Sequence, residues 1–267
     1  MERKIGVALV GCGRIAPLHA KALKELPFTE LVMTMDVIRE RAEEMAKEYG
    51  GKGTDDFQEV LANPVVEAVE ICTPHYNHAR LVLAALNAGK HVLVEKPMAI
   101  NVEDAKEMIS TAQNKGLQLG VIFQNRYNEA SRAVKEAIEK GELGQIRGAR
   151  AFLTWHRSDE YYKLDPWRGT WAQEGGGVLI NQAIHTLDLM QWLMGEIKTV
   201  SASCRRWGHH HIEVEDTAEA YFRFANGALG CFYANNCYPT DEPIFFEITG
   251  DRGKAQILAD RATIIID

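Results

Sequence analysis

The sequence lacks several features that would place it in a specialised class. Its five cysteines are scattered and show no C-x-x-C spacing, which argues against a disulfide framework and against a zinc site. No apolar run is long enough to span a membrane, and the apolar stretch near the N-terminus is interrupted too soon for a signal peptide. Internal repeats and low-complexity tracts are missing as well. We therefore expect a cytoplasmic globular protein without a metal site.

Positive charge is scarce relative to negative charge. The formal net charge is -7 and the sequence pI is about 5.8, so the surface as a whole repels nucleic-acid phosphates and anionic lipids. With 46% apolar and 25% charged residues, the composition is that of an ordinary globular protein. The length of 267 residues suits two domains. These values argue against nucleic-acid and membrane partners.

Short apolar runs alternate with helical periodicity over the first part of the chain. Strands are predicted at 5–10, 31–35, 67–72, 91–95 and 117–123, and helices at 17–26, 39–50, 77–90 and 102–116. Strands that alternate with helices indicate right-handed crossovers and a parallel sheet covered on both faces. We expect an α/β dinucleotide-binding domain of the Rossmann type over residues 1–124.

The pattern changes after residue 125. A helix at 128–144 is followed by a long strand at 145–155, a loop rich in aromatic residues and a single helix at 178–193. The remaining segments predict strands at 198–207, 216–224, 228–237, 244–250 and 254–259, two of them joined by a turn at 225–227. We expect an α+β domain with a largely antiparallel sheet over 125–267. The chain ends within a strand-like segment, which leaves open whether this domain is truncated.

The first strand is followed by G-x-G-x-x-A, the order expected of a dinucleotide-binding turn. Gly11 permits the turn, and Gly13 lets the backbone approach a pyrophosphate. Ala16 is small enough for the helix to pack on the strand. Arg14 and Ile15 lie where the helix begins, and free N–H groups at that end attract phosphate. A turn without any ligand remains the alternative on this pattern alone.

An acidic residue supports the dinucleotide interpretation. Asp36 follows the second strand about twenty residues after the glycines, where a carboxylate accepts hydrogen bonds from a ribose diol. The same carboxylate would repel a 2'-phosphate, although the nearby Arg39 could weaken that preference. The sequence therefore favours NAD over NADP.

Two further polar segments follow predicted strands. The carboxyl ends of parallel strands are where open α/β sheets bind ligands. The residues in these places are Thr73, Pro74 and His75 after the third strand, and Glu95, Lys96 and Pro97 after the fourth. A solvated surface lysine is the alternative interpretation of Lys96.

A glycine-rich turn at 175–177 precedes the predicted helix at 178–193. Asn181, His185 and Asp188 are spaced so that one continuous helix would place them on a single face. Histidine titrates near neutrality and can take a proton from a hydroxyl group, while Lys96 can polarise the oxygen or share the proton transfer. A buried structural histidine is the alternative for His185.

With these motifs the sequence resembles the family of glucose-fructose oxidoreductase, inositol dehydrogenase and MocA. Glu95-Lys96-Pro97 matches its E-K-P signature, and residues 175–195 match its glycine-rich turn and catalytic helix. The resemblance implies an NAD-dependent oxidoreductase with Lys96 and His185 as catalytic residues. Asn181 stands where the family often has aspartate, so it can orient His185 but cannot stabilise an imidazolium by charge.

The resemblance and the aromatic loop together indicate a sugar-like substrate. Aromatic faces stack on sugar C–H surfaces, and arginine donates forked hydrogen bonds to hydroxyls. The residues expected near substrate are Arg126, Trp167, Arg168, Asn181 and His185, with Asn125 near the nicotinamide. Three histidines at 209–211 are interpreted as a solvated loop.

The sequence leaves two alternative functions open. A redox sensor would bind the cofactor without turnover, and an NAD-dependent glycosidase would cleave a glycosidic bond through transient oxidation of the sugar. The resemblance also implies a homo-oligomer, a dimer or tetramer, formed through the sheet of the second domain.

Overall fold

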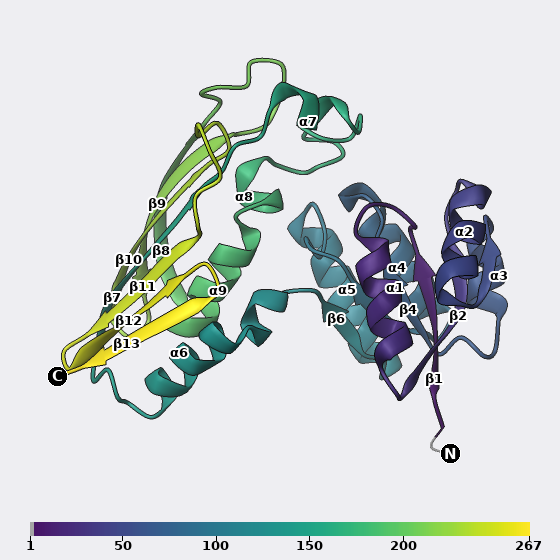
Figure 1. Cartoon of the computed structure of the whole chain (residues 1–267), viewed down its shortest axis with the longest axis horizontal. Coiled ribbons are helices and arrows are strands. Elements are labelled where there is room, and N and C mark those ends of the chain that lie inside the picture. The colour runs from purple at the N-terminus through teal and green to yellow at the C-terminus, as the bar shows by residue number, and fades with distance from the viewer. Residues whose placement is uncertain (1–2) are drawn as a thin grey trace. The chain divides into compact units, whose positions relative to one another are not determined.

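The computed structural model describes residues 3–267 and separates into two compact units. One unit extends to Ile122 and the other runs from Phe123 to Asp267. In Figure 1 the first unit is drawn in purple to blue and the second in teal to yellow.

The first unit is built on a six-stranded, entirely parallel sheet. The strands are β1 (Ile5–Val10), β2 (Thr29–Met35), β3 (Lys52–Thr54), β4 (Ala68–Ile71), β5 (His91–Val94) and β6 (Leu119–Val121). Their order in the sheet is β3-β2-β1-β4-β5-β6. The order reverses direction between β1 and β4, which is where such sheets bind ligands. The predicted Rossmann-type fold is confirmed.

Helices cover both faces of this sheet. They are α1 (Ala16–Glu25), α2 (Arg39–Tyr49), α3 (Phe57–Ala62), η1 (His75–Asn77), α4 (His78–Asn87) and α5 (Val102–Lys115). Alternate residues of β1 point to opposite faces. Val7 and Leu9 join one core with residues of α1 and α2, and Ala8 and Val10 join another with residues of α3, α4 and α5. The sequence analysis did not predict β3 or α3. Both are short, with three and six residues, and β3 contains no apolar run.

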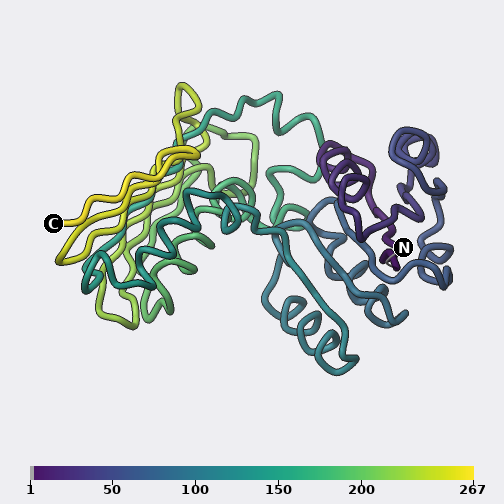
Figure 2. Tube along the Cα trace, turned by 60° about the horizontal axis from the view of Figure 1, so that its bottom comes forward, coloured from purple at the N-terminus to yellow at the C-terminus, as the bar shows by residue number. Residues whose placement is uncertain are grey.

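The second unit is built on a seven-stranded sheet in the order β13-β12-β11-β7-β10-β9-β8. The strands are β7 (Ile146–Thr154), β8 (Ile197–Arg205), β9 (Thr217–Phe224), β10 (Leu229–Asn235), β11 (Phe245–Gly250), β12 (Gly253–Leu258) and β13 (Arg261–Ile266). Only β7 and β10 pair in parallel, so the expected, largely antiparallel sheet is confirmed. Figure 2 shows the last strand, in yellow, at one edge of this sheet.

One face of the second sheet is covered by helices. These helices are α6 (Glu129–Glu139), α8 (Val178–Asn181) and α9 (Ile184–Met194). Two further elements are η2 (Gln124–Tyr127), which precedes α6, and α7 (Asp159–Lys163), which packs in a separate small cluster. Phe222 and Phe224 of β9 are buried in one core with Leu189 and Leu193 of α9 and Val134 of α6. The intervening β9 residues are exposed. Figure 1 shows α6 and α9 on the same side of the sheet.

The prediction of one continuous helix at 178–193 is wrong. The helix breaks between α8, which ends at Asn181, and α9, which begins at Ile184. The backbone makes a wide turn there, because the N–H of Ala183 donates to the carbonyl of Val178, five residues back, at 2.8 Å. Gln182 at the break is held by Asn236 and Tyr161. None of the helices within residues 3–267 is long and apolar enough to cross a membrane.

Candidate active site

The two glycines of the predicted dinucleotide turn serve different needs. Gly11 has a φ of +91°, and a Cβ there would lie 2.8 Å from the carbonyl carbon of Cys72. The fold itself therefore requires glycine at this position. A Cβ at Gly13 would meet no heavy atom of the described residues within 4 Å. The missing side chain at Gly13 leaves open space at the end of β1, which is the room a pyrophosphate needs.

The start of α1 fits an anion. Arg14 and Ile15 are exposed, and among the described residues no side chain caps this helix end. Ala16 is fully buried at 0% exposure, where a larger residue would push α1 off the sheet. The N–H groups of Ala16 and Leu18 already donate to the carbonyls of Gly13 and Ile15, and Pro17 has none. The backbone donors for a phosphate would therefore be those of the turn at residues 13–15.

Asp36 is held in a fixed position at the end of β2. Its Oδ2 accepts a hydrogen bond from the N–H of Cys12 at 2.8 Å, and its Oδ1 accepts one from the N–H of Ile38 at 2.9 Å. The residue is only 8% exposed. Each carboxylate oxygen has a second lone pair, so both can still accept a ribose hydroxyl. The guanidinium of Arg39 pairs with Glu43 and Asp55, at 3.0 and 3.1 Å.

The segments after β4 and β5 are tied together by a buried histidine. The ring nitrogens of His78 lie 2.7 Å from the carbonyl oxygen of Pro97 and 2.9 Å from that of Thr73. Burial lowers the pKa of His78. Pro74 directly precedes η1, whose first residue His75 is 5% exposed. The sequence analysis predicted a binding site at this edge of the sheet. It did not identify His78 as the residue that connects the segment after β4 with the segment after β5.

Glu95 and Lys96 lie beside a second histidine of the same unit. Glu95 accepts a hydrogen bond from the N–H of Lys96 at 3.0 Å through Oε2, and its Oε1 lies 3.0 Å from Nε2 of His19. The other ring nitrogen of His19 lies 2.5 Å from Glu70. Lys96 itself is half-buried. Sequence reasoning missed His19, although its place one turn after the glycine turn was a usable signal.

His185 occupies the first turn of α9 in the second unit. Its imidazole is half-buried and meets the ring of Phe123 edge-on, with centroids 6.0 Å apart. One turn further on, Asp188 accepts two hydrogen bonds from Arg126, at 2.7 Å from Nε and 2.5 Å from Nη2. The predicted substrate residue Arg126 is thus oriented by Asp188, and Asn125 precedes it in η2.

Asn181 is part of a buried polar network. Its Nδ2 donates to Oε1 of Glu174 at 2.5 Å, and the other oxygen of Glu174 accepts from the N–H of Gly169 at 2.5 Å. Asn181 is 8% and Glu174 1% exposed. The spacing predicted that Asn181 shares one helix face with His185 and Asp188. This prediction is wrong, because α8 ends at Asn181 and the other two residues lie on α9. Glu174 is a network member that the sequence did not reveal.

Arg168 lies between two aromatic rings. Its guanidinium carbon is 4.5 Å from the ring centroids of both Tyr161 and Trp167. It donates to the Tyr161 hydroxyl at 2.5 Å and to Asp165 at 3.1 Å. Burial raises the pKa of Tyr161, which therefore stays a neutral hydroxyl. The arrangement offers a rigid surface that combines aromatic faces with a guanidinium.

The interpretation of residues 209–211 as a solvated loop is wrong for its first member. His209 is 5% exposed, and its ring nitrogens lie 3.1 Å from Asp216 and 2.6 Å from the carbonyl oxygen of Arg157. Asp216 also accepts hydrogen bonds from the backbone N–H groups of Trp207, Gly208 and His209. Burial acts to lower the pKa of His209, but the contacts with Asp216 and Arg157 raise it. This pair folds the loop back onto the unit.

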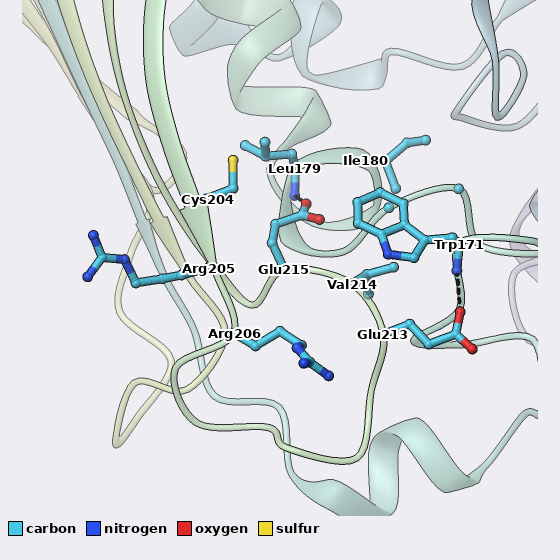
Figure 3. A pocket seen from close by; sticks show the side chains of 11 residues that line it. Trp171, Leu179, Ile180, Cys204, Arg205, Arg206, Glu213, Val214 and Glu215 are labelled. Atoms are coloured by element: carbon cyan, nitrogen blue, oxygen red, sulfur yellow. Dashed lines mark hydrogen bonds between the residues drawn. The ribbon is translucent and has the colours of Figure 1, made fainter.

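A hollow of about 420 Å³ lies next to α8 in the second unit (Figure 3). Its residues are Trp171, Gly175, Gly176, Leu179, Ile180, Cys204, Arg205, Arg206, Glu213, Val214 and Glu215. Figure 3 shows the Trp171 indole among the apolar side chains and Arg205 directed away from them. Of the described residues that line this hollow, none is a predicted substrate residue.

Comparisons with known proteins identify the family. Residues 5–123 match the model of the oxidoreductase family with an NAD-binding Rossmann fold, and residues 131–256 match a GFO/IDH/MocA C-terminal domain. The chain belongs to the GFO/IDH/MocA family. The resemblance of the Glu95-Lys96-Pro97 motif to this family is thereby confirmed.

Several relatives cover nearly the whole chain. Scyllo-inositol 2-dehydrogenase (NAD(+)) of Bacillus subtilis is 30% identical over 95% of this chain and 73% of its own length. Myo-inositol 2-dehydrogenase of Thermotoga maritima is 30% identical over 97% of this chain and 77% of its own. The solved WlbA dehydrogenase of Bordetella pertussis, in complex with NADH and UDP-GlcNAcA, has a TM-score of 0.94 and 33% identity, with 100% of this chain and 78% of that chain covered.

These findings assign the chain to a class of enzymes and to a cofactor. It is a member of a family of NAD-dependent dehydrogenases that act on alcohol groups of sugars and cyclitols. The glycine turn and Asp36 fit NAD: the space at Gly13 suits the pyrophosphate, and the fixed carboxylate suits an unphosphorylated ribose. The preference for NAD expected from the sequence agrees with this assignment.

Proposed function

We propose that the chain oxidises a secondary alcohol of a sugar, sugar derivative or cyclitol with NAD, or reduces the corresponding ketone. The observation that supports this most directly is Asp36, a carboxylate fixed by two backbone N–H groups at the edge where β1 and β4 reverse the sheet order. That position suits a ribose diol and so commits the first unit to NAD chemistry.

We propose that the first unit binds the cofactor through the segments that follow its strands. Gly11 and Gly13 form the turn, the α1 start with Arg14 and Ile15 faces the pyrophosphate, and Asp36 binds the ribose. The remaining residues proposed to bind NAD are Thr73, Pro74, His75, Glu95 and Lys96 of this unit, and Asn125, which belongs to the second unit. When bound, NAD accepts a hydride from the carbon that bears the hydroxyl group.

We propose that Lys96 and His185 carry out the proton transfer. As the carbon loses a hydride, which carries both electrons of the oxidation, the hydroxyl oxygen must lose one proton. His185 would take this proton on its imidazole, whose ordinary pKa lies near neutrality. The ammonium of Lys96 would donate a hydrogen bond to the same oxygen. Asn181, fixed by Glu174, would orient the substrate hydroxyl or His185.

The substrate is proposed to be a ring with several hydroxyl groups. Arg168 with Trp167 offers a stacked aromatic and cationic surface, and Arg126 is preset by Asp188 for a forked hydrogen bond. Such groups suit the C–H face and the hydroxyls of a sugar or cyclitol. The inositol specificity of two relatives and the nucleotide sugar bound to a third support this class.

A panel of sugars, nucleotide sugars and cyclitols with NAD tests the proposal. The expected result is an increase in the absorbance of reduced cofactor with at least one member of the panel. Measured NAD binding without reduction by any member would favour a redox sensor. Cleavage of a glycoside without net reduction of NAD would favour a glycosidase that oxidises its substrate transiently.

We further propose that two copies of the chain associate through the face of the second sheet that the helices leave bare. Tyr221 is 70% and Leu229 53% exposed, and cross-strand pairing places both on this face with Cys231. A shallow hollow of about 270 Å³ lies among these residues and the Arg150–Glu247 ion pair. Sedimentation of Tyr221→Asp should show smaller particles than the unaltered chain. We place this assembly in the cytoplasm.

A further inference from the structure

A histidine and two carboxylates form a compact cluster inside the first unit. His19 lies on α1, Glu70 on β4, and Glu95 directly after β5. Nδ1 of His19 is 2.5 Å from Glu70, and Nε2 is 3.0 Å from Glu95. The three side chains are 11%, 8% and 14% exposed. The cluster therefore joins three elements at the edge of the sheet where the cofactor residues lie.

The cluster works as a fixed cation between two anions. Both ring nitrogens face carboxylate oxygens, and both can donate only when the imidazole is protonated. Burial acts to lower the pKa of His19, but hydrogen bonds with Cys72, Glu70 and Glu95 raise it to about 12. The raised pKa favours the protonated imidazole, the form that can donate to both carboxylates. Its charge offsets two buried carboxylates, which would be costly without a partner.

We propose that His19 is a positioning residue for Lys96, acting by holding the carboxylate of Glu95. This inference rests on the proposed function, in which Lys96 contacts the substrate oxygen. Glu95 has one oxygen on His19 and the other on the backbone N–H of Lys96 at 3.0 Å. The backbone N–H of Glu95 donates to Ile71 of β4 at 2.9 Å, so the chain leading to Lys96 is fixed from two sides.

The charges around Lys96 explain why Glu95 needs this second partner. Burial acts to raise the pKa of Glu95, but the hydrogen bond and charge of His19 lower it, and the charge of Lys96 adds to that effect. Without His19, Glu95 would be drawn to the Lys96 ammonium and would compete with a substrate oxygen for it. The contact with His19 at 3.0 Å instead commits Oε1 of Glu95 to the imidazole.

A double-mutant cycle on His19 and Glu95 tests the proposal. For His19→Gln we expect kcat to fall about 10- to 100-fold, because small misplacement of a reacting group costs that much, while KM and the Kd for NAD change less than about threefold. Glu95→Gln should lower kcat to a similar extent and should also weaken NAD binding, because Glu95 is itself proposed to bind the cofactor. The double variant should lose no more kcat than the worse single variant. Lys21→Gln on the same helix, whose side chain is 65% exposed, is the matched control and should keep its activity. Additive losses, or an unchanged kcat in His19→Gln, would overturn the proposal.

A second measurement does not depend on turnover. Trace acylation of Lys96, followed by peptide mass spectrometry over a range of pH, reports the pKa of its ammonium in the NAD-free protein. Removing the cation in His19→Gln should raise that pKa, and removing the anion in Glu95→Gln should lower it. Unshifted labelling in both variants contradicts the proposal. If the pKa of Lys96 shifts as expected but the chain reduces NAD with no member of the panel, the positioning of Lys96 is supported and the proposed function is contradicted.

Discussion

The two units hold their polar residues in different ways. In the first unit Asp36, Thr73 and Glu95 all follow parallel strands, and backbone N–H groups fix Asp36 and connect Glu95 to Lys96. In the second unit Asn181 and Arg168 lie in the segment between β7 and β8, and side chains hold them. The first arrangement follows from the fold, whereas the second depends on particular side chains seven positions away in the same connecting segment.

This difference determines how each unit responds to substitution. Replacing a side chain held by the backbone leaves N–H groups unsatisfied but disrupts no network of side chains, so changes in the first unit should affect binding more than stability. A side chain within a hydrogen-bonded network leaves partners unsatisfied when it is replaced, at a cost of about 1–3 kcal/mol for each buried group. Changes in the second unit should therefore affect activity and stability together, except where the side chain contacts only substrate.

His185→Ala is expected to have the largest effect and to separate the two units functionally. The loss of the general base should lower kcat about 1,000-fold or more, since proton transfer by a positioned side chain contributes roughly 10²–10⁴-fold. Binding of NAD, measured by fluorescence titration, should stay within about threefold. His210→Ala at an exposed position is the control. Retention of most activity in His185→Ala would remove this residue from the mechanism.

Asn181→Asp tests the side-chain network of the second unit. The new carboxylate would lie where Asn181 now contacts Glu174 at 2.5 Å, and two carboxylates at that distance cannot both be ionised. One of them would have a raised pKa in the folded state. Stability is then fully present below about pH 4 and is lost as the pH rises through the folded pKa.

Urea unfolding at pH 5 and pH 8 measures this effect. Asn181→Asp should lose about 2 kcal/mol more stability than the unaltered chain between these values, which corresponds to a folded pKa about 1.5 units above pH 5. Asn128→Asp, at the exposed first position before α6, should show no such loss. An equal pH response in both variants would show that Glu174 and residue 181 are not coupled.

Asp36→Ala tests a side chain held by backbone groups in the first unit. We expect the affinity for NAD to fall about tenfold, or about 1.4 kcal/mol, and the ratio of NADP to NAD affinity to rise, since the carboxylate is proposed to bind the ribose diol and to repel a 2'-phosphate. Glu40→Gln, exposed on α2, serves as the control in the same fluorescence titration. Unchanged NAD binding in Asp36→Ala would disprove the ribose contact.

Much of the first unit could be predicted from the sequence because its site follows from local order. A glycine turn after an apolar strand, and polar residues after neighbouring parallel strands, have few alternative arrangements. What could not be predicted were the partners that lie far apart in sequence. His19 and Glu70 are separated by 51 positions, and no local pattern indicates that their side chains meet.

The second unit was predicted less completely, for a physical reason. The spacing at 178–193 correctly predicted helical structure on both sides of Ala183. The turn at Ala183 and the hydrogen bonds of Gln182 interrupt that helix. Such interruptions depend on tertiary contacts and leave no periodic signal. Likewise, the burial of His209 arises from Asp216, whose carboxylate gathers several N–H groups of the loop.

His209→Gln is expected to have the smallest effect, which is on stability. It tests a buried histidine of the second unit that, like His19 of the first, lies against a carboxylate. The folded pKa of His209 is raised, so its stabilisation is fully present below its unfolded pKa of about 6.5 and declines as the pH rises through the folded value. The variant should lose about 1 kcal/mol at pH 6 and less at pH 9. A loss that grows with pH would contradict the pairing with Asp216.

The most direct test of the central claim is isotope transfer. The panel member that reduces NAD fastest is prepared with deuterium on the carbon that bears the reacting hydroxyl, and the reduced cofactor is analysed by mass spectrometry. The account predicts one deuterium per molecule of reduced cofactor formed, a primary isotope effect when hydride transfer limits the rate, and loss of transfer in His185→Ala. Reduced cofactor without deuterium would contradict hydride transfer between this substrate and NAD.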